Sequence, residues 1–296
     1  MKSKLQQTLE KNSKVITAEL MPPRGGDPSR SLKIAQLLKE KVHAVNITDG
    51  SRAVMRMCSL AMSKLLLENG LEPVMQISCR DRNKIALQSD ILGANALGIR
   101  NILCITGDSV KAGDQQDAKA VHEFESVRLL QQIQAFNNGI DPTFRELPDE
   151  KTFIFSGAAA DPSCRNKRSL ENRIRKKKEA GAGFIQTQMV MEKENLIEFC
   201  EEISNPLELP VIAGVFLLKS YKNALFINKY VPGANIPEKI LNRLKDAKDP
   251  LQEGIKIAAE QAHDFINIAN GVHLMAVKAE HLIPEILKNA NLSLEY

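Results

Sequence analysis

The stretch Leu97–Asp108, L-G-I-R-N-I-L-C-I-T-G-D, contains the repeating unit of the fold. A helical pattern over Arg82–Leu97 ends before Gly98, a residue that suits a helix C-terminus because glycine enters the left-handed conformation without strain. The apolar run that follows predicts a buried parallel strand over Asn101–Thr106, closed by a Gly-Asp pair. A helix that leads into a strand with a polar end is typical of βαβ units.

The same alternation recurs along the whole chain. Short runs that are mostly continuously apolar alternate with longer helical patterns, as expected for parallel strands with helices on both faces. The predicted strands are Val15–Glu19, Ala44–Thr48, Pro73–Ile77, Asn101–Thr106, Thr152–Ser156, Gly183–Gln188, Val211–Val215 and Val272–Ala276. Eight strands in strict alternation predict an α/β protein with a closed (β/α)8 TIM barrel, in which residues 1–296 form a single domain. A six-stranded doubly wound sheet is the competing architecture.

Helices are predicted from the spacing of apolar residues. They are expected at Ser31–Lys39, Ala53–Glu68, Arg82–Leu97, Ser126–Phe136, Ser169–Ala180, Glu192–Ser204, Ala224–Tyr230, Ile255–Asn270 and Leu282–Ala290. The stretch Tyr230–Asp249 holds Pro-Gly and Ile-Pro turns, which predict an elaborated connection after the seventh strand.

The composition excludes several classes of protein. Aromatic residues make up 4% of the chain and Trp is absent, which disfavours a nucleic-acid binder that stacks bases on aromatic rings. The first residues of the chain are polar and lack the apolar core of a signal peptide, and no apolar stretch reaches the roughly 18 residues of a membrane span. The five cysteines and five histidines show no metal-binding spacing. We therefore expect a cytoplasmic protein with no metal, no membrane partner and no nucleic-acid partner.

One dense basic run interrupts a chain of mildly basic net charge, +4. It extends from Arg165 to Lys178 and contains eight Lys and Arg residues. A solvent-exposed helix face explains such a run, and so does a site for a phosphorylated ligand, because Lys and Arg supply the charge that phosphates need.

Polar residues gather at the same end of successive predicted strands. Glu19, Thr48, Gln76, Asp108 and Gln188 all lie at or just after the carboxyl end of a strand. In a (β/α)8 barrel this end carries the active site, whereas a purely structural barrel has no reason to collect polar groups there. The pattern therefore predicts an enzyme site at the mouth of the barrel.

Glu19 is the candidate general acid of this site. It follows an apolar-leaning run and precedes two prolines. A carboxyl at the edge of an apolar core loses hydration, which favours its protonated form and suits proton donation. A capping role or a salt bridge with Arg24 is the structural alternative.

Taken together, these sequence features resemble those of the methylenetetrahydrofolate reductase family, whose members are flavin-dependent barrels. The resemblance covers nearly the whole chain, from Val15 to about Ile286. The motifs that carry it are A-E-L-M-P-P-R (Ala18–Arg24), N-I-T-D-G (Asn46–Gly50), C-R-D-R-N (Cys79–Asn83), L-G-I-R-N-I-L-C-I-T-G-D (Leu97–Asp108), K-K-K-E-A-G-A (Lys176–Ala182), Q-T-Q (Gln186–Gln188) and G-V-H-L-M-A (Gly271–Ala276). Their order and spacing are more specific together than any one of them alone.

The resemblance implies a role for each matching position. Glu19 matches the catalytic glutamate that protonates the folate, so that its methylene bridge opens to an iminium that accepts hydride. The positions that match folate contacts are Asp108, Gln188, Tyr221 and Lys278, of which Lys278 is one residue out of alignment with the family's arginine. The positions that match or neighbour flavin contacts are Thr48, Gln76, Thr106, Gly107, Asp108, Asp161, Arg173, Lys176 and Lys177.

Departures from the family pattern fall on the outer contacts of the flavin. Thr106 stands where many members have arginine, and Gln76 stands where they have histidine. After the fifth strand, a family Tyr and His are replaced by the segment Gly157–Asp161. The implied cofactor is FAD, with FMN as the alternative, and NADH or NADPH is the implied electron donor.

The resemblance implies reduction of 5,10-methylenetetrahydrofolate to 5-methyltetrahydrofolate. Two other functions fit the sequence. One is the flavin-carrying subunit of a larger reductase, fed with electrons by a second subunit. The other is a barrel that binds a pterin or folate without redox chemistry. We expect a homo-oligomer in each case.

Overall fold

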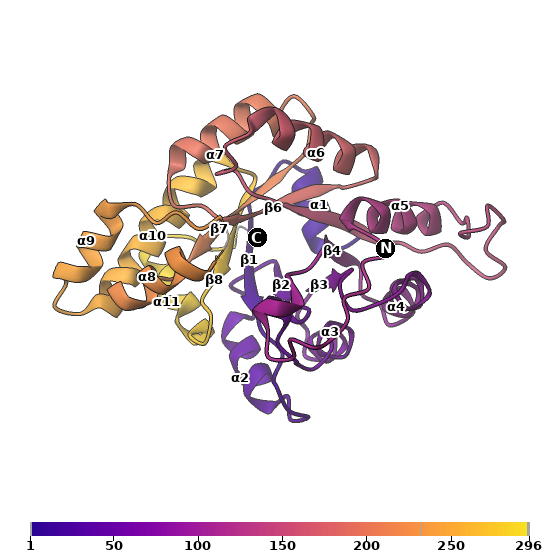
Figure 1. Ribbon diagram of the computed structural model, residues 1–296, viewed down its shortest axis with the longest axis horizontal. Coiled ribbons are helices and arrows are strands. Elements are labelled where there is room, and N and C mark those ends of the chain that lie inside the picture. Colours follow the sequence, from indigo (N-terminus) through magenta and orange to yellow (C-terminus); the bar gives the residue numbers. More distant parts are fainter. Residues whose placement is uncertain (1, 232, 295–296) are drawn as a thin grey trace.

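Eight parallel strands pair in chain order, and the first pairs with the last to close a barrel. The computed structural model describes residues 2–231 and 233–294. The strands are β1 (Val15–Leu20), β2 (Ala44–Ile47), β3 (Pro73–Ser78), β4 (Asn101–Ile105), β5 (Phe155–Ala160), β6 (Phe184–Met189), β7 (Val211–Phe216) and β8 (Gly271–Met275) (Figure 1). The closed ring confirms the predicted (β/α)8 barrel and excludes the six-stranded open sheet.

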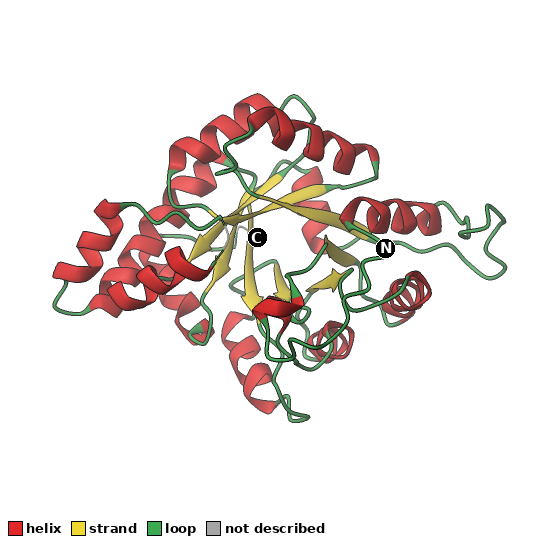
Figure 2. Cartoon of the chain, in the orientation of Figure 1, coloured by secondary structure: helices red, strands yellow, loops and turns green. Residues whose placement is uncertain are grey.

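Helices surround this barrel on its outer side (Figure 2). The α-helices are α1 (Lys4–Glu10), α2 (Ser29–Leu38), α3 (Ser59–Glu68), α4 (Lys84–Ala96), α5 (Ser126–Asn137), α6 (Lys167–Glu179), α7 (Lys193–Phe199), α8 (Tyr221–Tyr230), α9 (Glu238–Asp246), α10 (Pro250–Ile268) and α11 (Ile283–Asn289). Short helical turns are η1 (Ser51–Ala53), η2 (Val110–Ala112), η3 (Cys200–Ser204) and η4 (Glu280–Leu282). Within the described ranges, no helix combines the length and the hydropathy that a membrane crossing requires.

Local sequence fixes where several of these helices begin and end. Asn83 caps α4, Asn166 caps α6 and Asp249 caps α10, each through a side-chain oxygen that accepts backbone N–H groups of the first turn. Gly98, with a φ of +87°, turns the chain from α4 into β4, as predicted from the Leu97–Asp108 stretch.

Four elements differ from the prediction. The fifth strand was predicted at Thr152–Ser156 but lies at Phe155–Ala160, where Gly157 faces the large ring of Phe184 in the next strand. The helix predicted over Ala53–Glu68 begins only at Ser59, since Arg52 and Ala53 adopt left-handed conformations that interrupt the chain before it. Two helices, α1 and α9, were not predicted, and α9 lies within the expected connection after β7.

The amino end of the barrel is filled by an apolar layer. Its members come from the amino-terminal residues of the strands and from α1. They are Leu5, Leu9, Val15, Ala44, Val74, Leu103, Phe184 and Ile212. Glu72 holds α1 in place, because its carboxylate accepts the backbone N–H groups of Lys4 at 2.7 Å and Leu5 at 2.9 Å. This layer seals one end of the barrel and leaves the other end for chemistry.

A polar layer lies directly above the apolar one, two residues further along the strands. It contains Thr17, Asn46, Gln76, Gln186 and His273, none of which is more than 6% exposed. Along each strand, residues that point into the barrel alternate with residues that face the helices, so successive layers inside the barrel are two residues apart. The barrel is therefore apolar at its base and polar toward its mouth.

Candidate active site

Glu19 lies at the carboxyl end of β1, on the boundary between the buried polar layer and the open mouth. Its side chain is 17% exposed, and Oε2 lies 3.9 Å from Nε2 of His273. Arg24, the alternative partner considered from the sequence, forms an ion pair with Asp114 instead. Within residues 2–231 and 233–294, the carboxyl group of Glu19 therefore reaches the mouth without an ion pair to arginine or lysine.

His273 is a site residue that the sequence analysis did not single out. It is completely buried in β8, and its Nδ1 lies 2.9 Å from the hydroxyl oxygen of Thr17 in the neighbouring strand. Within the described residues, Nε2 has no hydrogen-bond partner. The signal in the sequence was a histidine in the middle of an otherwise apolar strand, G-V-H-L-M-A. Burying a polar side chain there costs free energy unless it forms a hydrogen bond or serves a function.

The polar layer continues across the barrel through β2 and β6. Asn46 Nδ2 donates a 2.7 Å hydrogen bond to Oε1 of Gln186 on the opposite side of the barrel. Thr48, just beyond β2, is 2% exposed. Among the described residues, neither Oδ1 of Asn46 nor Oγ1 of Thr48 finds a partner. Buried polar atoms of this kind are rare in proteins, and in a barrel mouth they suit a polar ligand.

The loop after β4 holds three of the predicted cofactor positions. Gly107 has a φ of +97°, and a Cβ at this position would lie 2.3 Å from Oγ of Ser78, so only glycine fits. Thr106 and Asp108 are exposed on either side of it. The Asp108 carboxylate accepts the backbone N–H of Arg52 at 2.6 Å, which ties the β4 loop to the loop after β2.

Asp49, although adjacent to the predicted flavin contact Thr48, serves the structure of the mouth. Its carboxylate accepts the backbone N–H of Ser78 at 2.8 Å and pairs with Arg82 at 2.6 Å. Burial opposes the charge of Arg82, yet the hydrogen bond and the charge of Asp49 prevail and raise the pKa of Arg82. A hollow of about 290 Å³ lies beside this pair, between the loops that follow β2, β3 and β4.

The remaining predicted folate contacts lie around the rim. Gln188 is exposed near the end of β6, where the pairing with β7 shifts its register between Gln186 and Met189. Tyr221 begins α8 and is half-buried against the apolar cluster under that helix. Lys278 is exposed after β8 with a φ of +61°. Each of these side chains follows a different strand, so the loops around the rim place them near one mouth.

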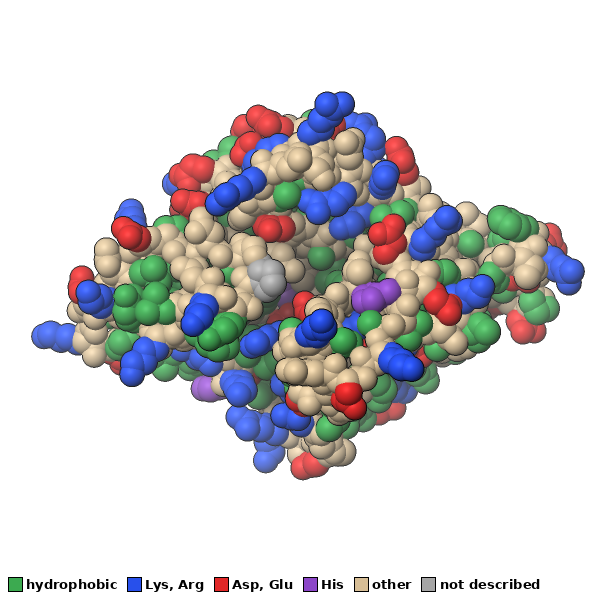
Figure 3. All heavy atoms as spheres, in the orientation of Figure 1, with side chains coloured by type: hydrophobic (Ala, Val, Ile, Leu, Met, Phe, Trp, Pro, Cys, Tyr) green, Lys and Arg blue, Asp and Glu red, His purple; other side chains and the backbone are tan. Residues whose placement is uncertain are grey.

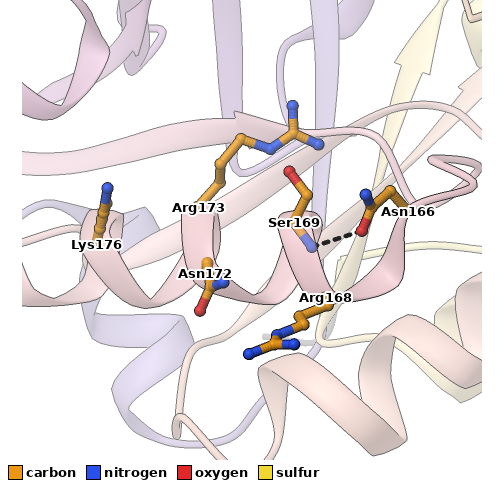
Figure 4. Close-up of a pocket in the computed structure, with 6 residues that line it drawn as sticks. All are labelled: Asn166, Arg168, Ser169, Asn172, Arg173 and Lys176. Atoms are coloured by element: carbon orange, nitrogen blue, oxygen red, sulfur yellow. Dashed lines mark hydrogen bonds between the residues drawn. The ribbon is translucent and has the colours of Figure 1, made fainter.

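The basic run of the sequence forms α6, and Lys and Arg side chains gather over this helix (Figure 3). A shallow depression of about 340 Å³ lies along it, lined by Asn166, Arg168, Ser169, Asn172, Arg173 and Lys176. Figure 4 shows Asn166, Ser169 and Arg173 directed to the same side of the helix. The depression contains no acidic residue, so it is suited to an anionic group such as a phosphate.

Lys177 on α6 and Asp161 in the loop before it both bind backbone groups. Lys177 Nζ donates a 2.7 Å hydrogen bond to the carbonyl oxygen of Ala159 at the end of β5, and burial lowers the pKa of its ammonium. Asp161 Oδ1 accepts the N–H of Ser163 at 2.9 Å. Arg173 reaches back to Sγ of Cys164 at 3.2 Å. Lys177 thus links α6 to the barrel wall, whereas Arg173 and Lys176 face the depression.

The structure divides the predicted residues into two groups. Glu19, Thr48, Gln76 and Gln188 lie on or just beyond strands at the mouth, and Asp108 reaches the mouth on the β4 loop. The basic residues lie on α6, in the helix layer outside the barrel wall. The unpartnered buried oxygens of Asn46 and Thr48 lie with the first group.

A sequence profile described as methylenetetrahydrofolate reductase matches residues 4–291 of the chain. Methylenetetrahydrofolate reductase 2 of Schizosaccharomyces pombe is 27% identical over 306 residues, which cover 93% of this chain and 45% of the yeast protein. A probable methylenetetrahydrofolate reductase (NADPH) of Caenorhabditis elegans is 23% identical over 311 residues, with 98% and 44% covered. The chain thus spans about half the length of these curated relatives, 45% and 44%.

Solved structures share the barrel. An uncharacterised protein from Clostridium thermocellum that binds two copies of 5-methyl-5,6,7,8-tetrahydrofolic acid superposes with a TM-score of 0.68 at 16% identity, over 98% of both chains. Tryptophan synthase from M. tuberculosis superposes with a TM-score of 0.52 at 12% identity, over 98% of both chains. At these identities the similarity shows a common fold.

Proposed function

Because the chain belongs to the methylenetetrahydrofolate reductase family, we propose that it reduces 5,10-methylenetetrahydrofolate to 5-methyltetrahydrofolate with the help of a bound flavin. The observation that carries the proposal is the position of Glu19, a carboxyl 17% exposed at the mouth of a barrel whose base is sealed. When bound, the flavin supplies the hydride that reduces the one-carbon group. The side chains of the barrel supply binding, orientation and the proton.

Glu19 is the proposed proton donor. Opening of the methylene bridge needs a proton on N10 of the folate, so that the bond from N10 to the bridging carbon breaks and leaves a cationic iminium at N5. The partly buried carboxyl lies at the barrel mouth, where a bound folate can reach it. Among the described residues, no lysine or arginine forms an ion pair with Glu19.

The folate ring would be held by side chains of the rim. Asp108 is exposed and already accepts one backbone N–H, and its second oxygen is free to accept from a pterin amine. Gln188 offers both a donor and an acceptor, Tyr221 an aromatic face, and Lys278 a positive charge for the glutamate end of the folate.

The flavin would be held between the mouth and α6. Thr48, Gln76, Thr106 and Gly107 would meet the ring system and its ribityl chain, and the free buried oxygen of Thr48 supports this placement. Asp161, Arg173, Lys176 and Lys177 would lie toward the phosphates, where the basic depression fits a pyrophosphate. FAD is proposed first and FMN second.

NADPH is the proposed electron donor, supported by the printed name of the Caenorhabditis elegans relative, with NADH as the alternative. A partner subunit that delivers electrons would replace the nicotinamide. Purified protein should show a flavin absorbance spectrum, and mass spectrometry of the released cofactor separates FAD from FMN. Bleaching of the flavin by NADPH or NADH, without added protein, would establish direct reduction. A bleach that appears only with a second protein would assign the chain as a flavin subunit.

A folate-binding barrel without redox chemistry is the second candidate. The observation that favours it is the fold shared with the Clostridium thermocellum protein that binds 5-methyltetrahydrofolic acid. Protein that is colourless and takes up neither FAD nor FMN, yet binds 5-methyltetrahydrofolate by calorimetry, would select this function and reject the reductase.

The variant Glu19→Gln tests the role of the acid. It removes the proton and keeps the size of the side chain. Flavin binding and reduction by the donor should remain near the wild-type level, whereas folate reduction should fall by roughly 10²- to 10⁴-fold, the usual contribution of a general acid. Stopped-flow measurement of each half-reaction separates the two effects. Folate turnover at the wild-type rate would refute the assignment of Glu19.

A further inference from the structure

The buried pair of His273 and Thr17 lies directly beneath the carboxyl of Glu19. Thr17 and Glu19 are two residues apart on β1, so both side chains point into the barrel. His273 is the residue of β8 that pairs in register with Thr17, and the two strands lie side by side (Figure 1). The imidazole therefore stands between the hydroxyl on one side, at 2.9 Å, and the carboxyl on the other, at 3.9 Å.

The hydrogen bonds of Thr17 assign a tautomer to His273. The hydroxyl of Thr17 lies 3.5 Å from the carbonyl oxygen of Val272, to which it can donate its single hydrogen. Its oxygen then accepts the hydrogen of His273 Nδ1. A neutral imidazole carries hydrogen on only one of its two nitrogens. Nε2 is consequently left with a lone pair directed toward Glu19.

The Glu19 carboxyl is the group that can match this lone pair. Within the described residues, Nε2 has no hydrogen-bond partner, and the Glu19 carboxyl lies 3.9 Å from it. A separation of 3.9 Å is too long for a hydrogen bond, so a small rotation of the Glu19 side chain would be needed to bring it to about 2.8 Å. A carboxyl that carries its proton can donate to Nε2, whereas a carboxylate cannot.

We propose that His273 is a positioning residue that fixes the orientation of the Glu19 carboxyl at the barrel mouth. The inference rests on the proposed function, because the acid has a task only if a folate is protonated there. Thr17 fixes the tautomer, and His273 in turn presents an acceptor to the acid. The step itself stays balanced, since the proton that leaves Glu19 appears on N10 of the folate and His273 gains and loses none.

Two substitutions of His273 separate this role from a structural one. The amide of His273→Asn occupies the place of Nδ1 and keeps the contact with Thr17, but it presents nothing to Glu19. The longer amide of His273→Gln reaches the place of Nε2 and restores an acceptor there. Single-turnover folate reduction should fall roughly 10- to 100-fold in the Asn variant, the cost of a hydrogen bond to an ionisable group, and by less than about threefold in the Gln variant. Flavin reduction by the donor should stay at the wild-type rate in both variants.

The opposite ranking, with the Gln variant slower than the Asn variant, would assign His273 to the Thr17 contact alone and overturn the proposal. Equal rates for the Asn variant and the wild type would overturn it as well. Folate affinity, measured separately, should be the same in both variants, because His273 touches no substrate.

A measurement without turnover keeps the inference testable if the variants fold poorly or if the reductase assignment fails. In ¹⁵N-histidine-labelled protein, the Nε2 resonance of His273 should have the shift of a nitrogen without hydrogen. It should respond to a titration step in the wild type that is missing in Glu19→Gln. His263, exposed on α10, is the matched control and should titrate identically in both proteins. Identical titration of His273 in both proteins, or a hydrogen on Nε2 at neutral pH, would refute the coupling. Absence of folate reduction by the wild type, with the coupling intact, would refute only the proposed function.

Discussion

Replacement of Gly157 by alanine should destabilise the barrel from within. Gly157 lies in β5 opposite Phe184 of β6, and the phenylalanine is completely buried in the apolar base. A Cβ at position 157 would lie 2.3 Å from Cζ of that ring, against about 3.4 Å for ordinary contact. The ring would have to move by about 1 Å, yet Phe155 packs on it at 5.2 Å between centroids and blocks an easy retreat.

The expected cost of Gly157→Ala follows from this geometry. Overpacking of a core by one methyl group costs roughly 1–3 kcal/mol, partly offset by about 0.5–1 kcal/mol from the reduced entropy of the unfolded chain. We expect the free energy of unfolding, measured by urea titration, to fall by about 1–2 kcal/mol. The midpoint of thermal unfolding should fall by roughly 2–4 °C per kcal/mol.

A double variant tests the stated cause. Phe184→Leu alone should cost about 1–2 kcal/mol through lost burial, but it opens space for the new methyl group. The double variant should therefore be at least about 1 kcal/mol more stable than the sum of the single effects predicts. Gly25→Ala, with nothing within 4 Å of its Cβ, is the control and should change stability by less than about 0.5 kcal/mol. Additive effects of Gly157→Ala and Phe184→Leu would refute the reasoning.

Three further predictions concern reactivity, pH and the site. Burial raises the pKa of the Cys79 thiol to about 12, whereas Cys58 is exposed. Iodoacetamide at pH 8 should therefore alkylate Cys58 at least about 100-fold faster than Cys79. Peptide mass spectrometry measures both rates, and comparable rates would contradict the burial of Cys79. The hydrogen bond from Arg243 lowers the pKa of Glu260 below its ordinary 4.5, so the pair stabilises the fold above that pH and the stabilisation is lost as the pH falls. Glu260→Gln should therefore cost less than about 1 kcal/mol at pH 7, because the pair is largely exposed. The cost should shrink as the pH falls below 4.5 and through the lowered pKa of Glu260, and a cost that grows in acid would be inconsistent with this linkage. Asp108→Asn should weaken folate binding, measured by calorimetry, by roughly 10-fold or more, and an unchanged affinity would leave Asp108 as a residue that only ties two loops together.

The strand order could be predicted because its signal is local. A strand is recognised from its own apolar run and a helix end from the glycine that follows it, as Leu97–Asp108 illustrates. The fifth strand was misplaced for a reason that is not local. Its residues Ser156–Ala160 have small side chains and low intrinsic strand preference, and within this strand Gly157 faces the large ring of Phe184, which fills the space that a larger residue would need.

The site could be predicted to the level of its strand ends. The sequence predicts that Glu19 and Asp108 lie at one mouth, because the carboxyl ends of parallel strands meet at one edge, whatever the details of packing. His273 was not found, since nothing in G-V-H-L-M-A reveals that its ring faces Thr17 across a closed barrel. Nor could the sequence reveal that Lys177 would bind the carbonyl of Ala159, because that contact depends on how α6 lies against β5.

The unpartnered polar atoms of the mouth have a thermodynamic consequence. Asn46 Oδ1 and Thr48 Oγ1 are buried without a hydrogen bond in the described part of the chain, and each such atom costs a fold about 1–3 kcal/mol. A ligand that forms hydrogen bonds with these atoms removes this cost and stabilises the folded state, so ligand binding raises the resistance to unfolding. The empty barrel is therefore expected to be the least heat-resistant form of the protein, and a melting-temperature screen across flavins and folates would identify its natural ligands by the stabilisation each one confers.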